Sequence, residues 1–165
     1  MARTASASDD FTIKEWDTMQ LKDIYTPDVA YCERATTALQ AAKLMRTKHV
    51  GDLVVVDDAD DACIPVGIVT DRDIVIQVLG AGRDPASVHV GELLNGPLVQ
   101  ARDSEDIFEA AARMFAHRVR RLPVTGPDQR LVGIVALDDL SRILVEQASA
   151  LLHITTSRRE QRTFR

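Results

Sequence analysis

The sequence repeats itself, and this repeat restricts the fold more than any other feature. The first copy reads LQAAKLM, HVGDLVVVD and VGIVTDRDI, and the second reads FEAAARM, RVRRLPV and VGIVALDDL. Met45 and Met114 lie 69 positions apart, as do Val50 and Val119. A unit of about 50 residues buries too little surface to be stable alone, so the two copies are expected to pack against each other.

Each copy predicts the same four elements: a helix, two short strands and a second helix. Ala38, Ala42 and Met45 recur at helical spacing and give the first helix one apolar face. The unbroken apolar run 53–56 is typical of a strand that is buried on both faces. Ser104 is the expected N-cap of the first helix of the second copy. The patterns together predict helices at 34–48, 71–79, 104–117 and from 137 onward, strands at 53–56, 66–69, 122–125 and 131–135, and a linker at 80–85.

The two copies resemble the CBS domain, which is named after cystathionine β-synthase, over residues 21–144. The resemblance is carried by LKDIYTP at 21–27, VGDL at 50–53, GIVTDRD at 67–73, HRVRRLPV at 117–124 and GIVALDD at 133–139. It implies an α+β fold of two β-α-β-β-α units packed by pseudo-twofold symmetry, with a C-terminal helical extension. The expected division is an N-terminal extension, partly disordered, at 1–20, units at 21–84 and 85–145, and a C-terminal helix and basic tail at 146–165.

The resemblance is to small stand-alone bacterial CBS pairs, and it implies a function as well as a fold. Such pairs bind AMP, ADP or ATP, and in some members NAD or S-adenosylmethionine, in clefts between the units, and two pairs associate into a homodimer. The chain is therefore expected to be a non-catalytic regulatory or sensor module with no obligatory cofactor, acting on an unidentified downstream protein. The alternative is a dimerisation or protein-interaction module with no bound nucleotide.

The family signature for ribose and phosphate is Gly-h-x-Ser/Thr-x-x-Asp, and Gly67, Thr70 and Asp73 satisfy it. A carboxylate such as that of Asp73 can accept hydrogen bonds from both ribose hydroxyls, and the Thr70 hydroxyl can donate to an anion. The second copy keeps Asp139 but has Ala136 in place of the hydroxyl residue. The ligand is therefore expected on the side of Thr70 and Asp73, whereas the loss at Ala136 favours the alternative without a nucleotide.

Phosphates need cations, and resemblance to nucleotide-binding CBS pairs assigns this role to Arg120 and Arg121. The adenine ring is expected among Val50, Ile68 and apolar residues near Leu98. The complete predicted ligand site consists of Val50, Gly51, Asp52, Ile68, Thr70, Asp71, Asp73, Leu98, Val99, Arg120, Arg121, Leu122, Pro123 and Asp139.

Each of these features also has a purely structural explanation. Asp71 and Asp73 are suited to cap a helix and complement its dipole at the start of the helix predicted over 71–79. The arginines can form a solvated strand edge or ion pairs with nearby acids. His49 and His117 end predicted helices, where a cation is favourable, and we interpret both as structural.

Composition excludes several other classes of protein. A net charge of −5 argues against a nucleic-acid-binding surface. The two cysteines favour a reducing cytosol over a disulfide framework, and with the histidines they form no closely spaced ligand pairs for zinc. No motif of a nucleophile elbow is present, so the chain is not expected to be an enzyme. With no secretory leader and no apolar run of about 18 residues, a cytoplasmic protein without a membrane span is expected.

The predicted C-terminal helix has an apolar stripe that must be buried somewhere, and a partner chain is one place for it. The stripe consists of Leu140, Ile143, Leu144, Gln147, Ala148, Leu151 and Leu152.

Overall fold

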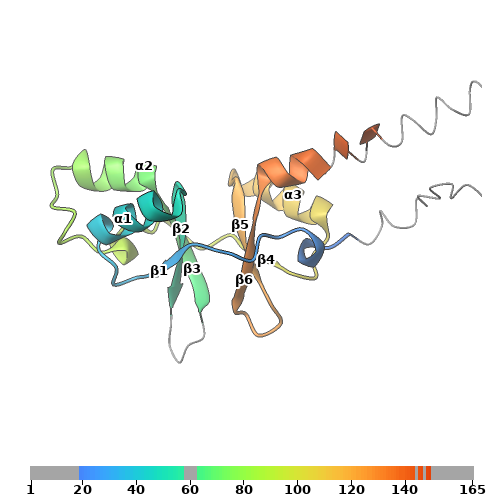
Figure 1. Ribbon diagram of the computed structural model, residues 1–165, viewed down its shortest axis with the longest axis horizontal. Helices are drawn as coiled ribbons and strands as arrows, with labels where there is room; N and C mark the ends of the chain where they lie inside the picture. Colours follow the sequence, from blue (N-terminus) through green and yellow to red (C-terminus); the bar gives the residue numbers. More distant parts are fainter. Residues whose placement is uncertain (1–18, 58–62, 144, 147, 150–165) are drawn as a thin grey trace, which may run out of the picture.

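The computed structural model describes residues 19–57, 63–143, 145–146 and 148–149. Within these ranges the chain forms two lobes, each with a three-stranded sheet whose helices lie on its outer side, so that the two sheets are adjacent at the centre (Figure 1). This arrangement confirms the predicted α+β fold of two packed units. No helix in the described part of the chain is long and apolar enough to cross a membrane.

The first unit has the strand order β1-β2-β3, with β1 parallel and β3 antiparallel to β2. The second unit repeats this topology with the order β4-β5-β6. The elements of the first unit are β1 (Tyr31–Glu33), α1 (Ala38–Lys48), β2 (Asp52–Asp57), β3 (Ile64–Thr70), α2 (Asp71–Asp73) and its continuation as a π-helix, η4 (Ile74–Leu79). Those of the second are β4 (Ala101–Arg102), α3 (Ile107–His117), β5 (Arg121–Thr125), β6 (Leu131–Ala136) and helical residues 137–143.

The main helix of each unit begins at a residue whose side chain caps it. Thr37 caps α1 by accepting a hydrogen bond from the backbone N–H of Gln40, and Asp106 caps α3 by accepting one from that of Phe108. The prediction of Ser104 as N-cap was therefore wrong by two residues, because the turn that follows β4 continues to Asp106. The predicted start of α1 at residue 34 was also too early, since residues 34–36 form a turn.

Each core contains a short segment that precedes the other unit in the sequence. Leu21, in the 3-10 helix η2 (Leu21–Asp23), is fully buried in the second core, and Val90, in η5 (Val90–Leu93), is fully buried in the first. The Leu21 N–H donates to the carbonyl of Glu105 at 2.9 Å, and the Val90 N–H donates to that of Thr36 at 2.8 Å. The two bonds are equivalent under the pseudo-twofold symmetry, because Val90 lies 69 positions after Leu21 and Thr36 lies 69 positions before Glu105. The two packed cores are therefore not contiguous in the sequence.

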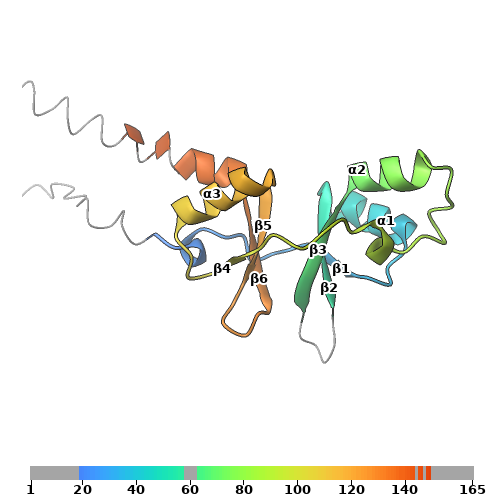
Figure 2. The same cartoon turned by 180° about the vertical axis from the view of Figure 1, so that it is seen from behind.

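Two extended segments join these short helices to the sheets, and we name them connector 25–30 and connector 94–99. Connector 25–30 runs from the second lobe to β1, and connector 94–99 runs from the first lobe toward β4 (Figure 2). Because the two connectors cross between the lobes in opposite directions, they hold the two units together.

The start of the C-terminal helix packs on its own chain. Leu140 is fully buried in the second core, and Leu137 and Ile143 pack against it. These turns of the predicted apolar stripe are thus covered within the unit and need no partner chain. Leu144, Gln147, Leu151, Leu152, the N-terminal extension up to residue 18 and the tail from residue 150 lie outside the described residues.

Candidate functional site

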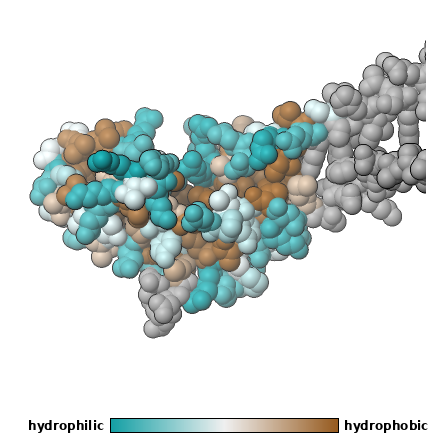
Figure 3. Space-filling model, viewed as in Figure 1, coloured by the Kyte–Doolittle hydropathy of each residue, from teal (hydrophilic) through white to brown (hydrophobic). Residues whose placement is uncertain are grey.

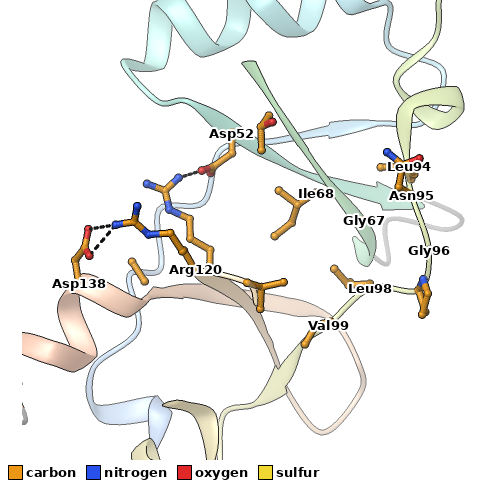
Figure 4. Close-up of a pocket in the computed structure, with 15 residues that line it drawn as sticks. Asp52, Gly67, Ile68, Leu94, Asn95, Gly96, Leu98, Val99, Arg120 and Asp138 are labelled. Atoms are coloured by element: carbon orange, nitrogen blue, oxygen red, sulfur yellow. Dashed lines mark hydrogen bonds and ion pairs between the residues drawn. The ribbon is translucent and has the colours of Figure 1, made fainter. Parts of the chain in front are cut away.

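A cavity of about 550 Å³ lies between the two units, where β3 faces the start of β5 and the end of β6 (Figure 4). Connector 94–99 closes one side of it. Cavities of roughly 300–1,000 Å³ are the usual size of small-molecule sites. The space-filling view shows a notch between the two lobes, with hydrophilic side chains on both sides of it (Figure 3).

The wall of the cavity is aliphatic and comes from both units. Ile68 projects from β3, Val119 comes from the loop before β5, and Leu98 and Val99 come from the connector (Figure 4). Aromatic side chains are absent from its lining among the residues that have described coordinates. Such a wall can cover the faces of a flat apolar ring but offers it no aromatic stacking.

Four charged side chains line the same cavity, and they form two ion pairs. The Arg120 Nη2 atom lies 3.1 Å from Oδ1 and 3.4 Å from Oδ2 of Asp138, and the side chains are 77% and 81% exposed. Arg121 pairs with Asp52, whose side chain is only 17% exposed. Asp52 and Arg121 occupy equivalent positions in the two copies, 69 residues apart, so this pair lies where the two units meet. The charges that the described residues place on the cavity wall therefore sum to zero.

The cavity is open because connector 94–99 does not pair with the sheet. In the equivalent place, Thr26 exchanges two backbone hydrogen bonds with Ile134 of β6, at 2.9 and 3.0 Å. Asn95, the counterpart of Thr26, forms no such bridge within the described residues. The next residue, Gly96, has a φ of 76°, a left-handed conformation that glycine adopts without strain and that its counterpart Pro27 cannot adopt.

Thr70 and Asp73 form a capping box at the start of α2. The Thr70 hydroxyl and N–H both donate to Asp73 Oδ2, at 2.6 and 2.9 Å, and the Asp73 N–H donates to Thr70 Oγ1 at 3.1 Å. Asp73 therefore takes part in capping the helix, as its structural explanation predicted. Asp73 Oδ1 accepts only a long bond, 3.3 Å, from the Gln77 amide, so it keeps capacity for a further donor.

Seven of the fourteen predicted residues line this cavity, and the others lie elsewhere. The seven are Asp52, Ile68, Thr70, Leu98, Val99, Arg120 and Arg121. Val50, Gly51 and Asp71 line a second pocket of about 580 Å³ between α1 and η4. Leu122 and Pro123 are buried within β5. Asp73 caps α2 beside the cavity, and Asp139 lies 3.8 Å from Arg142 on the C-terminal helix.

Val119 lines the cavity in the place where Val50 was predicted, and the packing of the two units explains why. Val50 and Ile68 belong to the same copy and were expected to share one cleft, but in the structure Ile68 lines the cavity with Val119, the counterpart of Val50, and Val50 lines a different pocket. Sequence reasoning also missed Asn95, Gly96 and Asp138. The 69-residue offset signals Val119, and the turn-forming run Asn-Gly-Pro at 95–97 signals the bend in the connector.

Other titratable groups give no indication of catalysis or of metal binding in the described residues. Burial raises the pKa of the Cys32 thiol to about 11, which keeps it protonated and unreactive at neutral pH. The backbone N–H of His89, and then Arg83, lower the pKa of the exposed Glu92 carboxyl. The part of the chain with described coordinates contains no group of three or more His, Cys, Asp or Glu residues placed to hold a metal ion.

Comparison with known proteins identifies the repeat. The family model described as "CBS domain" matches residues 21–80 and 90–146. Hypoxic response protein 1 of Mycobacterium tuberculosis is 38% identical over 127 residues, which are 77% of this chain and 86% of that protein. An uncharacterized protein of Methanopyrus kandleri, MK0525, is 31% identical over 116 residues, 70% of this chain but 58% of that protein, so the chain spans little more than half of that relative.

Two solved structures share the fold. A crystal structure of Hypoxic Response Protein I with two coordinated zinc ions has a TM-score of 0.66 and 36% identity, covering 75% of this chain and 98% of that one. The structure of CBSX2, a CBS-pair protein of Arabidopsis thaliana, in complex with AMP has a TM-score of 0.64 and 27% identity, covering 78% of this chain and 98% of that one.

Proposed function

Because this chain belongs to the CBS-domain family, as a tandem pair, we propose that it is a non-catalytic regulatory module that binds an adenine nucleoside ligand in the cavity between its units. The observation that carries the proposal is the cavity itself. It has the volume of a small-molecule site, an aliphatic wall from both units and arginine side chains at one end. The AMP bound by CBSX2 supports the choice of ligand class.

The proposed pose uses the chemistry of each wall. The ring of the base would lie between Ile68 of β3 and the connector residues Leu98 and Val99, out of water. The ribose would lie toward Thr70, where Asp73 Oδ1 has capacity to accept a hydroxyl hydrogen bond. A 5′ substituent would point toward Arg120, whose exposed pair with Asp138 is weak enough to be replaced.

Regulation requires that the ligand favour one arrangement of the protein over another. The cavity is suited to this because its wall is divided between the two units and the connector that joins them. A ligand that contacts β3, β5 and connector 94–99 together would fix their spacing. This change would be transmitted to a downstream protein, or to a second copy of the chain.

The proposal also includes a homodimer of CBS pairs. In the first unit Val75, Ile76 and Leu79 of η4 are more than half exposed, and in the second Phe108 and Phe115 of α3 are 51% and 88% exposed. Large apolar side chains grouped on helices are typical of surfaces that bind another protein. The same surfaces support the second candidate function, an assembly module with no ligand, because both cavity arginines already have carboxylate partners.

Thermal unfolding with added ligands separates the two functions. We would compare AMP, ADP, ATP, NAD and S-adenosylmethionine at millimolar concentration. A ligand at about 100 times its Kd adds about 2.7 kcal/mol, which corresponds to a rise in Tm of roughly 5–11 °C for a chain of this size. We expect at least one adenosine ligand to raise the Tm. If none of the ligands raises the Tm, the assembly module is favoured.

Two matched variants locate the ligand. Asp73→Asn removes the carboxylate beside the cavity, and Asp139→Asn changes its counterpart in the second copy. The ligand-induced rise in Tm, measured against each variant's own baseline, is expected to shrink in Asp73→Asn and to persist in Asp139→Asn. The reverse result would place the ligand in the other cleft.

A further inference from the structure

The charged groups on the cavity wall restrict which adenine nucleoside it can take. They are Arg120, Arg121, Asp52 and Asp138, two cations and two anions that are already paired. A polyphosphate chain needs several cations that are free to face it, because each added phosphate brings at least one more negative charge. Within the described part of the chain, the lining of this cavity supplies no cation that lacks a carboxylate partner.

The two ion pairs differ in how readily they can be opened. The pair of Arg120 with Asp138 is exposed on both sides, so water and a single phosphate can compete with the carboxylate. The pair of Arg121 with Asp52 is different, because Asp52 is mostly buried and, among the residues that the structure describes, loses its cationic partner if Arg121 turns away. One arginine can therefore be released to a ligand, and the other stays engaged.

On this basis, which rests on the function proposed above, we infer that the site selects adenine nucleosides of low charge. It accepts a nucleoside with an uncharged 5′ group or with one phosphate and rejects the diphosphate and triphosphate. Asp138 determines this preference. Its carboxylate remains near Arg120 after displacement and repels any phosphate beyond the first.

The inference is tested by isothermal titration of the full-length protein with 5′-methylthioadenosine, AMP, ADP and ATP. For the wild type, AMP and 5′-methylthioadenosine are expected to bind at least about tenfold more tightly than ATP, because like charges at a few ångströms oppose binding by this order. Wild-type protein that binds ATP as tightly as AMP would overturn the inference while leaving the proposed function intact. Binding of none of the four, together with no rise in Tm with NAD or S-adenosylmethionine, would remove the proposed function itself.

Charge variants assign the preference to its residues. Asp138→Asn frees Arg120 and should raise ATP affinity about fivefold, with 5′-methylthioadenosine unchanged. Arg120→Gln should weaken AMP about tenfold and again spare 5′-methylthioadenosine. Glu109→Gln is the control, since it makes the same change in net charge at an exposed site on α3 outside the cavity. An equal gain of ATP affinity in Glu109→Gln and Asp138→Asn would show a general charge effect and reject the role of Asp138.

Discussion

Connector 25–30 and connector 94–99 occupy equivalent positions, yet one closes a cleft and the other opens one. Thr26 pairs with Ile134 in an isolated β-bridge, and the Tyr25 ring lies against Gly133 and fills the space beside β6. Asn95 forms no such bridge within the described residues, Gly96 has a left-handed conformation, and both line a cavity of about 550 Å³. The duplicated fold thus has a paired connector on one side and an unpaired one on the other, because the two connectors differ in sequence at every equivalent position.

The largest effect is expected where a short helix completes the opposite core. Leu21→Ala leaves a void in the second core and should lower the free energy of unfolding by about 3 kcal/mol. Hydrogen exchange should accelerate in β4–β6 before β1–β3. The matched variant Val90→Ala should show the opposite order with a smaller loss, because fewer atoms are removed. Faster exchange in the first unit of Leu21→Ala would refute the crossed packing.

The two strand glycines give the next contrast. A Cβ at Gly133 would overlap atoms of the rigid Tyr25 ring, whereas the nearest atoms to one at Gly67 are the two terminal methyls of the flexible Leu94 side chain, at 2.6 and 2.7 Å. Gly133→Ala should therefore destabilise by about 1–3 kcal/mol and Gly67→Ala by less than about 1 kcal/mol. Urea unfolding measures both. Equal losses of stability in the two variants would mean that connector 25–30 shifts to accommodate a Cβ as easily as connector 94–99 does.

A smaller difference should be visible only at alkaline pH. Cys32 of β1 has Ala101 of β4 as its counterpart, so only the first unit contains a buried thiol. Burial raises the pKa of Cys32 to about 11. Since the unfolded thiol ionises near pH 8.5 and the folded thiol later, stability is unaffected below that pH and falls as pH rises toward 11.

Cys32→Ala tests this expectation by making the two strands alike. The variant should lose about 1 kcal/mol at neutral pH from reduced packing, but its stability should decline less steeply between pH 9 and 11. Denaturant unfolding at a series of pH values provides the measurement. Parallel pH profiles for the variant and the wild type would exclude ionisation of Cys32 as the cause of any alkaline loss.

The accuracy of the sequence predictions depends on how local each feature is. The strands around Val54 and Ile134 and the helices around Met45 and Met114 were found from apolar spacing, which nearby residues determine. The N-cap was misplaced from Asp106 to Ser104 because two residues suited to capping lie within one turn. Seven of the predicted site residues line the cavity, but Val119 and Asp138, which line it as well, were not predicted, because their place beside β3 depends on how the two units pack.

The sequence by itself determined the duplicated unit, its order of elements and the signature at Thr70 and Asp73, because repeats, apolar spacing and short motifs can be read within one stretch of chain. Only the tertiary structure decided which residues of the two copies share a cavity and that Arg120 and Arg121 are already paired with acids. Such partners are far apart in the sequence, and their meeting depends on how two sheets pack. The same packing leaves one connector paired and the other open, a distinction that no local pattern contains.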